Sequence, residues 1–205
     1  MLDSASAATF AASEIVETGA GAMRALTMIE AALREARLER EQIECLAVGL
    51  GPGSYTGIRA AIALAQGWQL ALNIKLLGVS SADAVAVQAQ TEGFSGNASV
   101  AIDAQRGELY LARYEIAPER WRELRPLQLA TLSEATAREQ AGDLVIGPEA
   151  SRWFPRGRIV FPRATAIGKL ALGRTDFVPG ETLEPIYLRE AKFVKAPPPR
   201  VMPQS

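Results

Sequence analysis

The sequence predicts an α/β protein built in two parts. Short apolar segments alternate with longer segments of helical periodicity along its 205 residues, the pattern typical of strands and helices in alternation. Residues 91–97, TEGFSGN, gather Gly, Ser and Asn, and strand-like segments resume directly after them. Such a turn-rich segment indicates a boundary. We therefore expect one domain over residues 1–96 and a second over residues 97–195.

The first domain is expected to alternate strands and helices. Its strands are predicted at residues 9–16, 43–50 and 75–81, and its helices at residues 22–36, 56–72 and 82–90. The segment IECLAVGL at residues 43–50 is almost continuously apolar, which predicts a strand buried on both faces of a sheet. The helix at 56–72 has only a narrow polar stripe, so we expect it to be covered on several sides.

The second domain begins with strands at residues 98–104, 107–116 and 124–130. A short turn at Gln105, Arg106 and Gly107 joins the first two as a hairpin. A helix capped by Ser133, a strand at residues 143–147 and a helix near residues 164–172 complete the domain. Residues 196–205 are rich in proline and lack apolar periodicity, so a disordered tail is predicted there.

Composition narrows the classes of function. The net charge of −1 argues against a protein that attracts nucleic acid over its whole surface. Cys45 is the single cysteine and histidine is absent, which lowers the expectation of an enzyme with its own metal ligands or general base. No apolar stretch of about 18 residues occurs. We expect a cytoplasmic protein with no membrane contact, and the absence of histidine makes a self-sufficient catalytic site or a bound metal less expected.

The glycine-rich stretch VGLGPGSYTGIR, residues 48–59, joins a predicted strand to a predicted helix. It lacks the lysine of a P-loop, and its third glycine comes one residue too late for a dinucleotide fingerprint. Backbone N–H groups at the helix start still allow anion binding. The interpretation favoured by spacing is a tight strand-to-helix turn, with Ser54 or Thr56 as the cap.

Four segments carry a resemblance to a known family. They are GPGSYTGIR at residues 51–59, GVSS at 78–81, IDAQRGELY at 102–110 and EPIYLR at 184–189. In their order and approximate spacing, and over nearly the whole chain, the protein resembles the TsaB (YeaZ) family. The first motif supplies the loop of interest: Gly51, Pro52, Gly53, Ser54, Tyr55, Thr56, Gly57 and Arg59. The resemblance implies two domains of the actin-like ATPase, or ribonuclease H-like, type, with mixed sheets flanked by helices.

The resemblance also implies a function. Proteins of this family are non-catalytic subunits in bacterial tRNA threonylcarbamoyladenosine synthesis, where they bind a TsaD-type transferase and act with a TsaE-type ATPase. The resemblance implies that tRNA is bound by the complex as a whole. It also implies that this protein can form a homodimer. We expect no cofactor on the chain alone, with ATP or ADP at the interface of the complex. The transferase holds its metal with two histidines on its first long helix, and the matching helix here has none.

In this family the dimer surface is formed by the first two helices of the N-terminal domain. The expected partner-binding residues are therefore Met23, Leu26, Met28, Ile58, Ala61, Ile62, Ala65 and Trp68. The small residues of the second helix suit close approach of another helix. The alternative is a central helix covered by its own domain, and composition alone leaves both open.

Two further groups of residues are weaker candidates. Asp3 and Ser4, together with Asp103, match the turns at which actin-like ATPases approach nucleotide phosphates. The stretch at residues 151–163 interleaves four arginines with three aromatic residues, a composition that suits RNA but also a solvated loop with its aromatic rings turned inward. The rival function is a stand-alone actin-fold kinase or acyl transferase that uses Asp3 and Asp103 as metal-linked carboxylates.

The sequence departs from the family at its start. Relatives have a full apolar strand before the segment that contains Asp3, whereas only Met1 and Leu2 precede it here. We expect either a start upstream of Met1 or an N-terminal sheet of reduced size.

Overall fold

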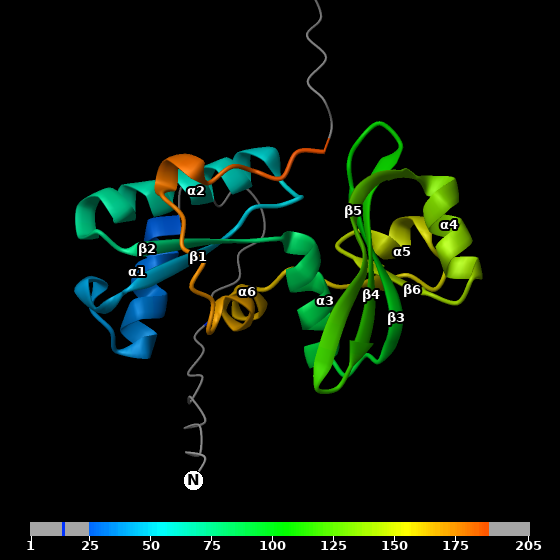
Figure 1. Ribbon diagram of the computed structural model, residues 1–205, viewed down its shortest axis with the longest axis horizontal. Coiled ribbons are helices and arrows are strands. Elements are labelled where there is room, and N and C mark those ends of the chain that lie inside the picture. Colours follow the sequence, from blue (N-terminus) through cyan, green and yellow to red (C-terminus); the bar gives the residue numbers. More distant parts are fainter. Residues whose placement is uncertain (1–13, 15–24, 189–205) are drawn as a thin grey trace, which may run out of the picture.

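The computed structural model describes residue 14 and residues 25–188, and within these ranges it forms two sheets with helices packed around them (Figure 1). The strands are β1 (Cys45–Gly49), β2 (Lys75–Val79), β3 (Gly96–Asp103), β4 (Glu108–Ala117), β5 (Arg120–Thr131), β6 (Leu144–Gly147) and β7 (Arg158–Ile159). The α-helices are α1 (Ala25–Ala36), α2 (Tyr55–Leu72), α3 (Ser81–Thr91), α4 (Leu132–Gln140), α5 (Ala150–Trp153) and α6 (Ala164–Ala171). Two 3₁₀ turns, η2 (Arg40–Gln42) and η3 (Gly180–Thr182), complete the described elements.

The first sheet consists of β1 and β2, which run parallel within the described part of the chain. Helix α2 connects them and covers one face of the sheet, while α6 packs against the other (Figure 1). Val48 is the one fully buried residue of β1, and Cys45 and Ala47 are half-buried. The prediction of a strand buried on both faces is therefore corrected: the eight-residue α6 covers its face of the sheet only in part.

The second sheet is larger and has the strand order β5-β4-β3-β6-β7. β3 is antiparallel to β4 and parallel to β6. Ala135 of α4, Ala150 of α5 and Phe154 pack on one face of this sheet, and α3 packs on the other through Val85 and Ala86. Because both faces are covered, β3 is continuously buried from Ala98 to Ile102, whereas β4 alternates buried and half-buried residues.

Helix α3 lies between the two sheets and links them (Figure 1). At its first turn the Tyr114 hydroxyl of β4 donates a hydrogen bond of 2.7 Å to Asp83. Burial raises the pKa of the Asp83 carboxyl, although that hydrogen bond acts in the opposite direction. The chain after α6 returns to the first sheet, where Val178 forms a β-bridge with Leu76. The predicted division at residues 96 and 97 falls at the start of β3, but α6 and Val178, from the predicted second domain, pack on the first sheet. The two-domain division stays a prediction.

Side-chain caps define where several helices begin. Ser54 accepts a hydrogen bond from the Gly57 N–H at the start of α2, and Ser80 accepts one from Ala82 at the start of α3. The predicted Ser133 cap is wrong, because Thr131 caps α4 and forms a capping box with Glu134. Thr131 stands three residues before a glutamate that reaches back to its backbone N–H, which is the geometry of that motif.

Several predictions concern residues outside the described ranges. These are the strand at residues 9–16 apart from Glu14, the start of the helix at 22–36, and the tail at 196–205. Glu14 accepts a hydrogen bond of 2.7 Å from the Arg163 guanidinium. Within the described ranges, the structure contains no helix that is long and apolar enough to cross a membrane.

Candidate partner-binding site

The glycine-rich loop between β1 and α2 brings three of the four sequence motifs together. The Gly51 carbonyl accepts a hydrogen bond of 2.8 Å from the N–H of Ser81, in the second motif. The Leu50 carbonyl accepts one of 2.8 Å from Ile186, in the fourth motif. Gly51 has a φ of +91°, and a Cβ placed there would lie 2.6 Å from the Ile58 side chain. The loop is therefore a tight turn into α2, as its spacing predicts.

An exposed cluster of Tyr55, Arg59 and Tyr187 lies at the start of α2. The Arg59 guanidinium carbon is 4.0 Å from the centre of the Tyr55 ring, and its Nε donates a hydrogen bond of 3.1 Å to the Tyr187 hydroxyl. The two tyrosine rings are tilted, with centres 6.0 Å apart. An arginine held over an aromatic face is attracted by the ring. This cluster fastens the C-terminal segment to the first turn of α2.

The burial of α2 divides the predicted partner-binding residues. Ile62 and Ala65 are only 6% and 2% exposed and belong to the core of the first sheet. The prediction is therefore revised for these two residues, because they hold α2 on the sheet and face away from solvent. Ile58, Ala61 and Trp68 are half-buried and pack against the same core.

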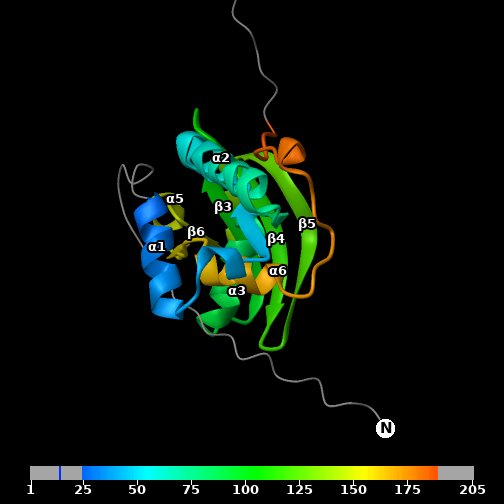
Figure 2. The same cartoon turned by 90° about the vertical axis from the view of Figure 1, so that its left-hand side faces the viewer.

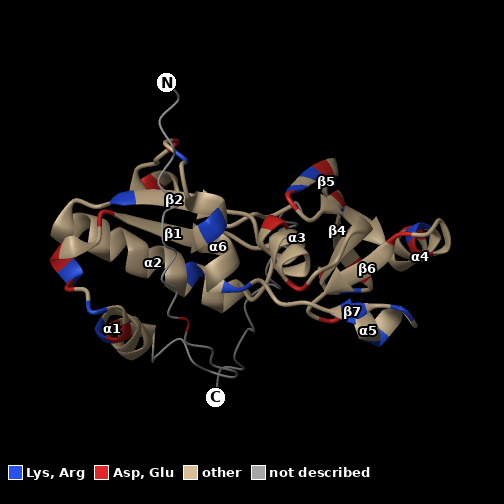
Figure 3. Cartoon of the chain, turned by 90° about the horizontal axis from the view of Figure 1, so that it is seen from below, with Lys and Arg blue, Asp and Glu red and all other residues tan. Residues whose placement is uncertain are grey.

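The opposite side of α2 carries small or apolar residues that are exposed, apart from the half-buried Ala60. It consists of Thr56, Ala60, Ala63, Gly67 and Leu70, which alternate steps of four and three residues and so share one helix face. Leu70 is 89% exposed. Arg59 is the one charged residue of α2, which appears almost uniformly uncharged in Figure 3. We call these five residues the α2 outer face.

Helix α1 is amphipathic but has no fully buried residue. It lies at the edge of the first half, beside the first sheet in Figure 2 and away from the second sheet in Figure 3. Leu26 is 55% exposed and Met28 is half-buried, whereas Met23 lies outside the described residues. Apolar side chains left accessible on a helix of this kind indicate a surface that contacts something else.

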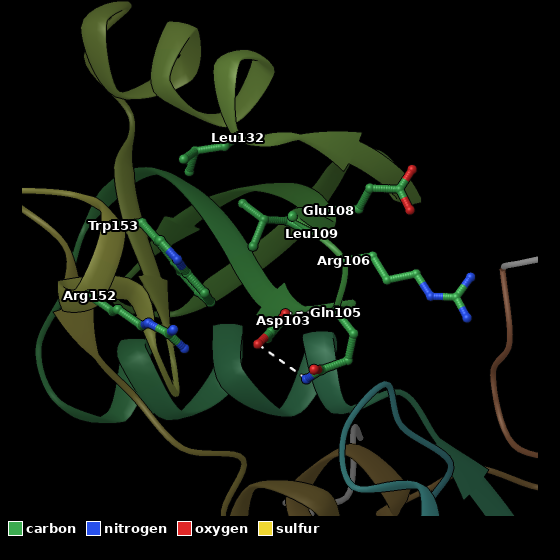
Figure 4. A pocket seen from close by; sticks show the side chains of 9 residues that line it. Asp103, Gln105, Arg106, Glu108, Leu109, Leu132, Arg152 and Trp153 are labelled. Carbon is green, nitrogen blue, oxygen red and sulfur yellow. Dashed lines mark hydrogen bonds between the residues drawn. The ribbon is translucent and has the colours of Figure 1, made fainter.

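Asp103, the candidate nucleotide-proximal residue of the second half, ends β3. Its carboxylate accepts hydrogen bonds of 2.7 and 3.2 Å from the backbone and side chain of Gln105, which orders the hairpin turn. A cavity of about 270 Å³ lies beside it, between the hairpin, the start of α4 and α5 (Figure 4). Asp3 and Ser4 lie outside the described residues.

The sequence reasoning passed over Glu149, which follows β6 next to Asp103. One of its carboxylate oxygens is buried without a hydrogen-bond partner. Burial raises the pKa of the Glu149 carboxyl, while the backbone N–H of Asp103 acts to lower it. The signal that could have found Glu149 is its place shortly after a predicted strand. The parallel pairing of β3 and β6 brings the carboxyl ends of both strands to one edge of the sheet. Within the described residues no group of three acidic or cysteine side chains is arranged to hold a metal ion.

The arginine-rich stretch at residues 151–163 is partly tied into the protein. Phe154 is fully buried, and Phe161 is 57% exposed. The Arg156 guanidinium donates to the backbone carbonyl of Glu139, and Arg163 pairs with Glu14. Arg152 lies over the Trp153 ring at 5.4 Å from its centre. The structure therefore does not gather these arginines into one solvated patch.

Comparisons with known proteins agree with this architecture. Residues 22–178 match a family model described as "TsaD: tRNA N6-adenosine threonylcarbamoyltransferase". The tRNA threonylcarbamoyladenosine biosynthesis protein TsaB of Escherichia coli is 30% identical over 187 residues, which cover 81% of this chain and 79% of that protein. The protein of the same name from Haemophilus influenzae is 28% identical and covers 85% of this chain and 82% of its own length. The structure of YeaZ from Pseudomonas aeruginosa superposes with a TM-score of 0.73 at 26% identity, over 84% of this chain and 87% of the other.

Sheets flanked by helices, together with this likeness, define the class: a two-part α/β protein of the actin-like, ribonuclease H-like fold. The extent of the sequence match then narrows the class. The chain belongs to the TsaB (YeaZ) family of tRNA threonylcarbamoyladenosine biosynthesis proteins.

Proposed function

We propose that this protein is the non-catalytic subunit of the machinery that makes threonylcarbamoyladenosine in tRNA, and that it binds a TsaD-type transferase through the α2 outer face and α1. The names of its relatives support the pathway. The observation that carries the binding surface is the exposed apolar side of α2 in a helix that has only one charged residue. Such a side costs free energy in water and suits burial against a partner.

The chemistry of the α2 outer face indicates a helix as the partner element. Ala60, Ala63 and Gly67 project little from the helix axis, which allows the axis of a second helix to approach closely. Leu70 at the end of the face is a large apolar side chain available for a partner's pocket. Leu26 and Met28 of α1 supply the second element of the surface. A homodimer through the same surface is the alternative occupant.

The absence of histidine supports a non-catalytic role, because the chain lacks the side chain most used as a general base and as a nitrogen ligand for metals. Under this proposal the transferase supplies the active site, and a TsaE-type ATPase and tRNA join through the complex. ATP or ADP binds at the interface of the complex and not to this chain alone. The whole assembly is cytoplasmic.

Gly67→Arg tests the proposed surface. A Cβ atom placed at the exposed Gly67 meets no atom within 4 Å, and glycine is a poor helix residue, so the isolated variant should melt at the same or a higher temperature. We expect its affinity for the TsaD-type protein of the same organism, measured by calorimetry, to fall at least tenfold. Ala137→Arg on the exposed side of α4 is the matched control and should bind normally.

Unchanged affinity of the Gly67→Arg variant would overturn the proposed surface. A titration of the isolated chain with ATP and Mg²⁺ addresses the rival enzyme function in the same instrument. We expect no heat of binding from the chain alone. Tight binding with turnover would instead favour a stand-alone actin-fold enzyme.

A further inference from the structure

The cavity at the carboxyl end of β3 lies apart from the α2 outer face. It opens on the side of the second sheet that carries α4 and α5, whereas α3 and the first sheet lie on the other side. Its volume is about 270 Å³. In open α/β sheets, ligands bind outside the carboxyl ends of parallel strands. The position and size of the cavity therefore suit a ligand group of one or two rings.

Part of the cavity wall is apolar. Trp153 of α5, Leu109 of β4 and Leu132 of α4 lie around one space in Figure 4. Trp153 is half-buried and packs against the core beneath the sheet, which fixes the plane of its indole ring. An aromatic ring held in this way offers a stacking surface to any planar group.

The polar side chains around the cavity are two carboxylates, two guanidinium groups and one amide: Asp103, Glu108, Arg106, Arg152 and Gln105. The Asp103 carboxylate has two oxygens with about four lone-pair positions, and Gln105 occupies two of them. The Arg152 guanidinium lies over Trp153 and forms no ion pair among the described residues. Arg106 is exposed at the hairpin tip and extends away from Trp153 (Figure 4).

We propose that this cavity binds an unpaired nucleotide of the tRNA substrate, an inference that rests on the function proposed above. The base stacks on Trp153, and an amino group on its edge donates to Asp103. Arg152 and Arg106 contact the neighbouring phosphates, as arginines beside aromatic rings do in single-strand recognition. A lysine or arginine of a protein partner fits less well, because its charge would be repelled by Arg152 beside the same ring.

Fluorescence of Trp153 tests the proposal directly. Changing Trp68 and Trp121 to Phe leaves Trp153 as the one tryptophan of the full-length chain. An anticodon stem-loop RNA added to the complex of this variant with the TsaD-type protein should quench that emission, because a stacked base quenches an indole. Arg152→Ala should weaken the binding of the RNA to the complex about tenfold, in line with the loss of one charge-assisted phosphate contact. Arg125→Ala, an exposed arginine in the middle of β5, is the matched control and should bind RNA normally.

Two results would overturn the proposal. One is RNA binding by the complex with no change in Trp153 emission and no loss on Arg152→Ala. The other is equal quenching by free ATP at the same concentration, which would make the ligand a free nucleotide. Calorimetry with the TsaD-type protein separates this from the proposed function, because Arg152→Ala should leave that affinity unchanged. If the complex with the TsaD-type protein does not form, the proposed function is wrong. The quenching of Trp153 by RNA is then measured with the chain alone. RNA quenching by the chain alone would still support the cavity, and its absence would refute it.

Discussion

The two halves of the molecule differ in how completely they bury their own elements. In the second half both faces of a five-stranded sheet are covered, and α3 is buried along most of its length. In the first half the described sheet has two strands, α1 has no buried residue, and one side of α2 is exposed. A half that leaves apolar helix faces accessible is suited to binding a partner. A half whose faces are covered is suited to being a stable support for that binding half.

Two arginines show the same difference at the scale of single residues. Arg113 in the second half forms two hydrogen bonds of 2.8 Å to Asp143, which is 1% exposed and also accepts from the buried Ser99 hydroxyl. Arg59 in the first half contacts two exposed tyrosines. Hydrogen bonds to a buried charge are costly to remove, whereas exposed cation–ring contacts contribute little. Substituting each arginine and measuring the free energy of unfolding therefore shows how far the two halves differ in the strength of such contacts.

The largest effect is expected for Arg113→Ala. It leaves the Asp143 carboxylate buried without its cation, which should lower the free energy of unfolding by about 3 kcal/mol. Urea unfolding at pH 7 measures this. The double variant R113M/D143L removes both charges and should recover most of the loss. A loss below about 1 kcal/mol for the single variant would mean that water reaches Asp143 and that the second half is less closed than its geometry indicates.

A smaller effect is expected for Arg59→Ala. The loss of exposed ring contacts and one hydrogen bond should lower the free energy of unfolding by about 1 kcal/mol. The change should be local, so hydrogen exchange of the Ile186 N–H, which donates to Leu50, is the sharper measurement. Tyr187→Phe keeps the ring and removes only the hydroxyl, so exchange should quicken less. If the Ile186 N–H exchanged at the normal rate in both variants, the cluster would not fasten the C-terminal segment.

The smallest effect, and the one expected gain, is for Glu149→Gln. The folded protein raises the pKa of this carboxyl, so wild-type stability falls as the pH rises from the unfolded value through the folded one. Glutamine avoids the charge and should add less than about 1 kcal/mol at pH 7, since the carboxyl is partly exposed. The gain should vanish below about pH 4, where both forms are neutral. Urea unfolding of the variant and the wild type at pH 7 and below about pH 4 measures this. The same difference in free energy of unfolding at both pH values would contradict the prediction.

Local signals predicted most elements of the fold. The predicted helix at residues 56–72 and the turn before it are confirmed, because helical periodicity and a glycine-rich turn act over short distances. The Ser133 cap failed because Thr131 and Ser133 are both good caps, and the choice depended on where Glu134 reaches. Ile62 and Ala65 were assigned to a partner because an almost wholly apolar helix does not reveal which side its own sheet covers.

The candidate sites divide in the same way. The motifs at residues 51–59 and 184–189 identified the region of the Tyr55, Arg59 and Tyr187 cluster, but their contact joins residues more than a hundred positions apart. The closeness of Glu149 to Asp103 likewise follows from the pairing of β3 with β6. Leu70 looks like any other apolar residue of α2 until the helix is placed on its sheet.

The sequence by itself determined the family, the α/β class and the lack of histidine chemistry, because composition and short motifs are properties of the chain. Only the tertiary structure decided which side of α2 is free, which arginines are held by carboxylates, and which residues surround the cavity at Trp153. Burial and pairing depend on elements far away along the chain, so no local pattern contains them.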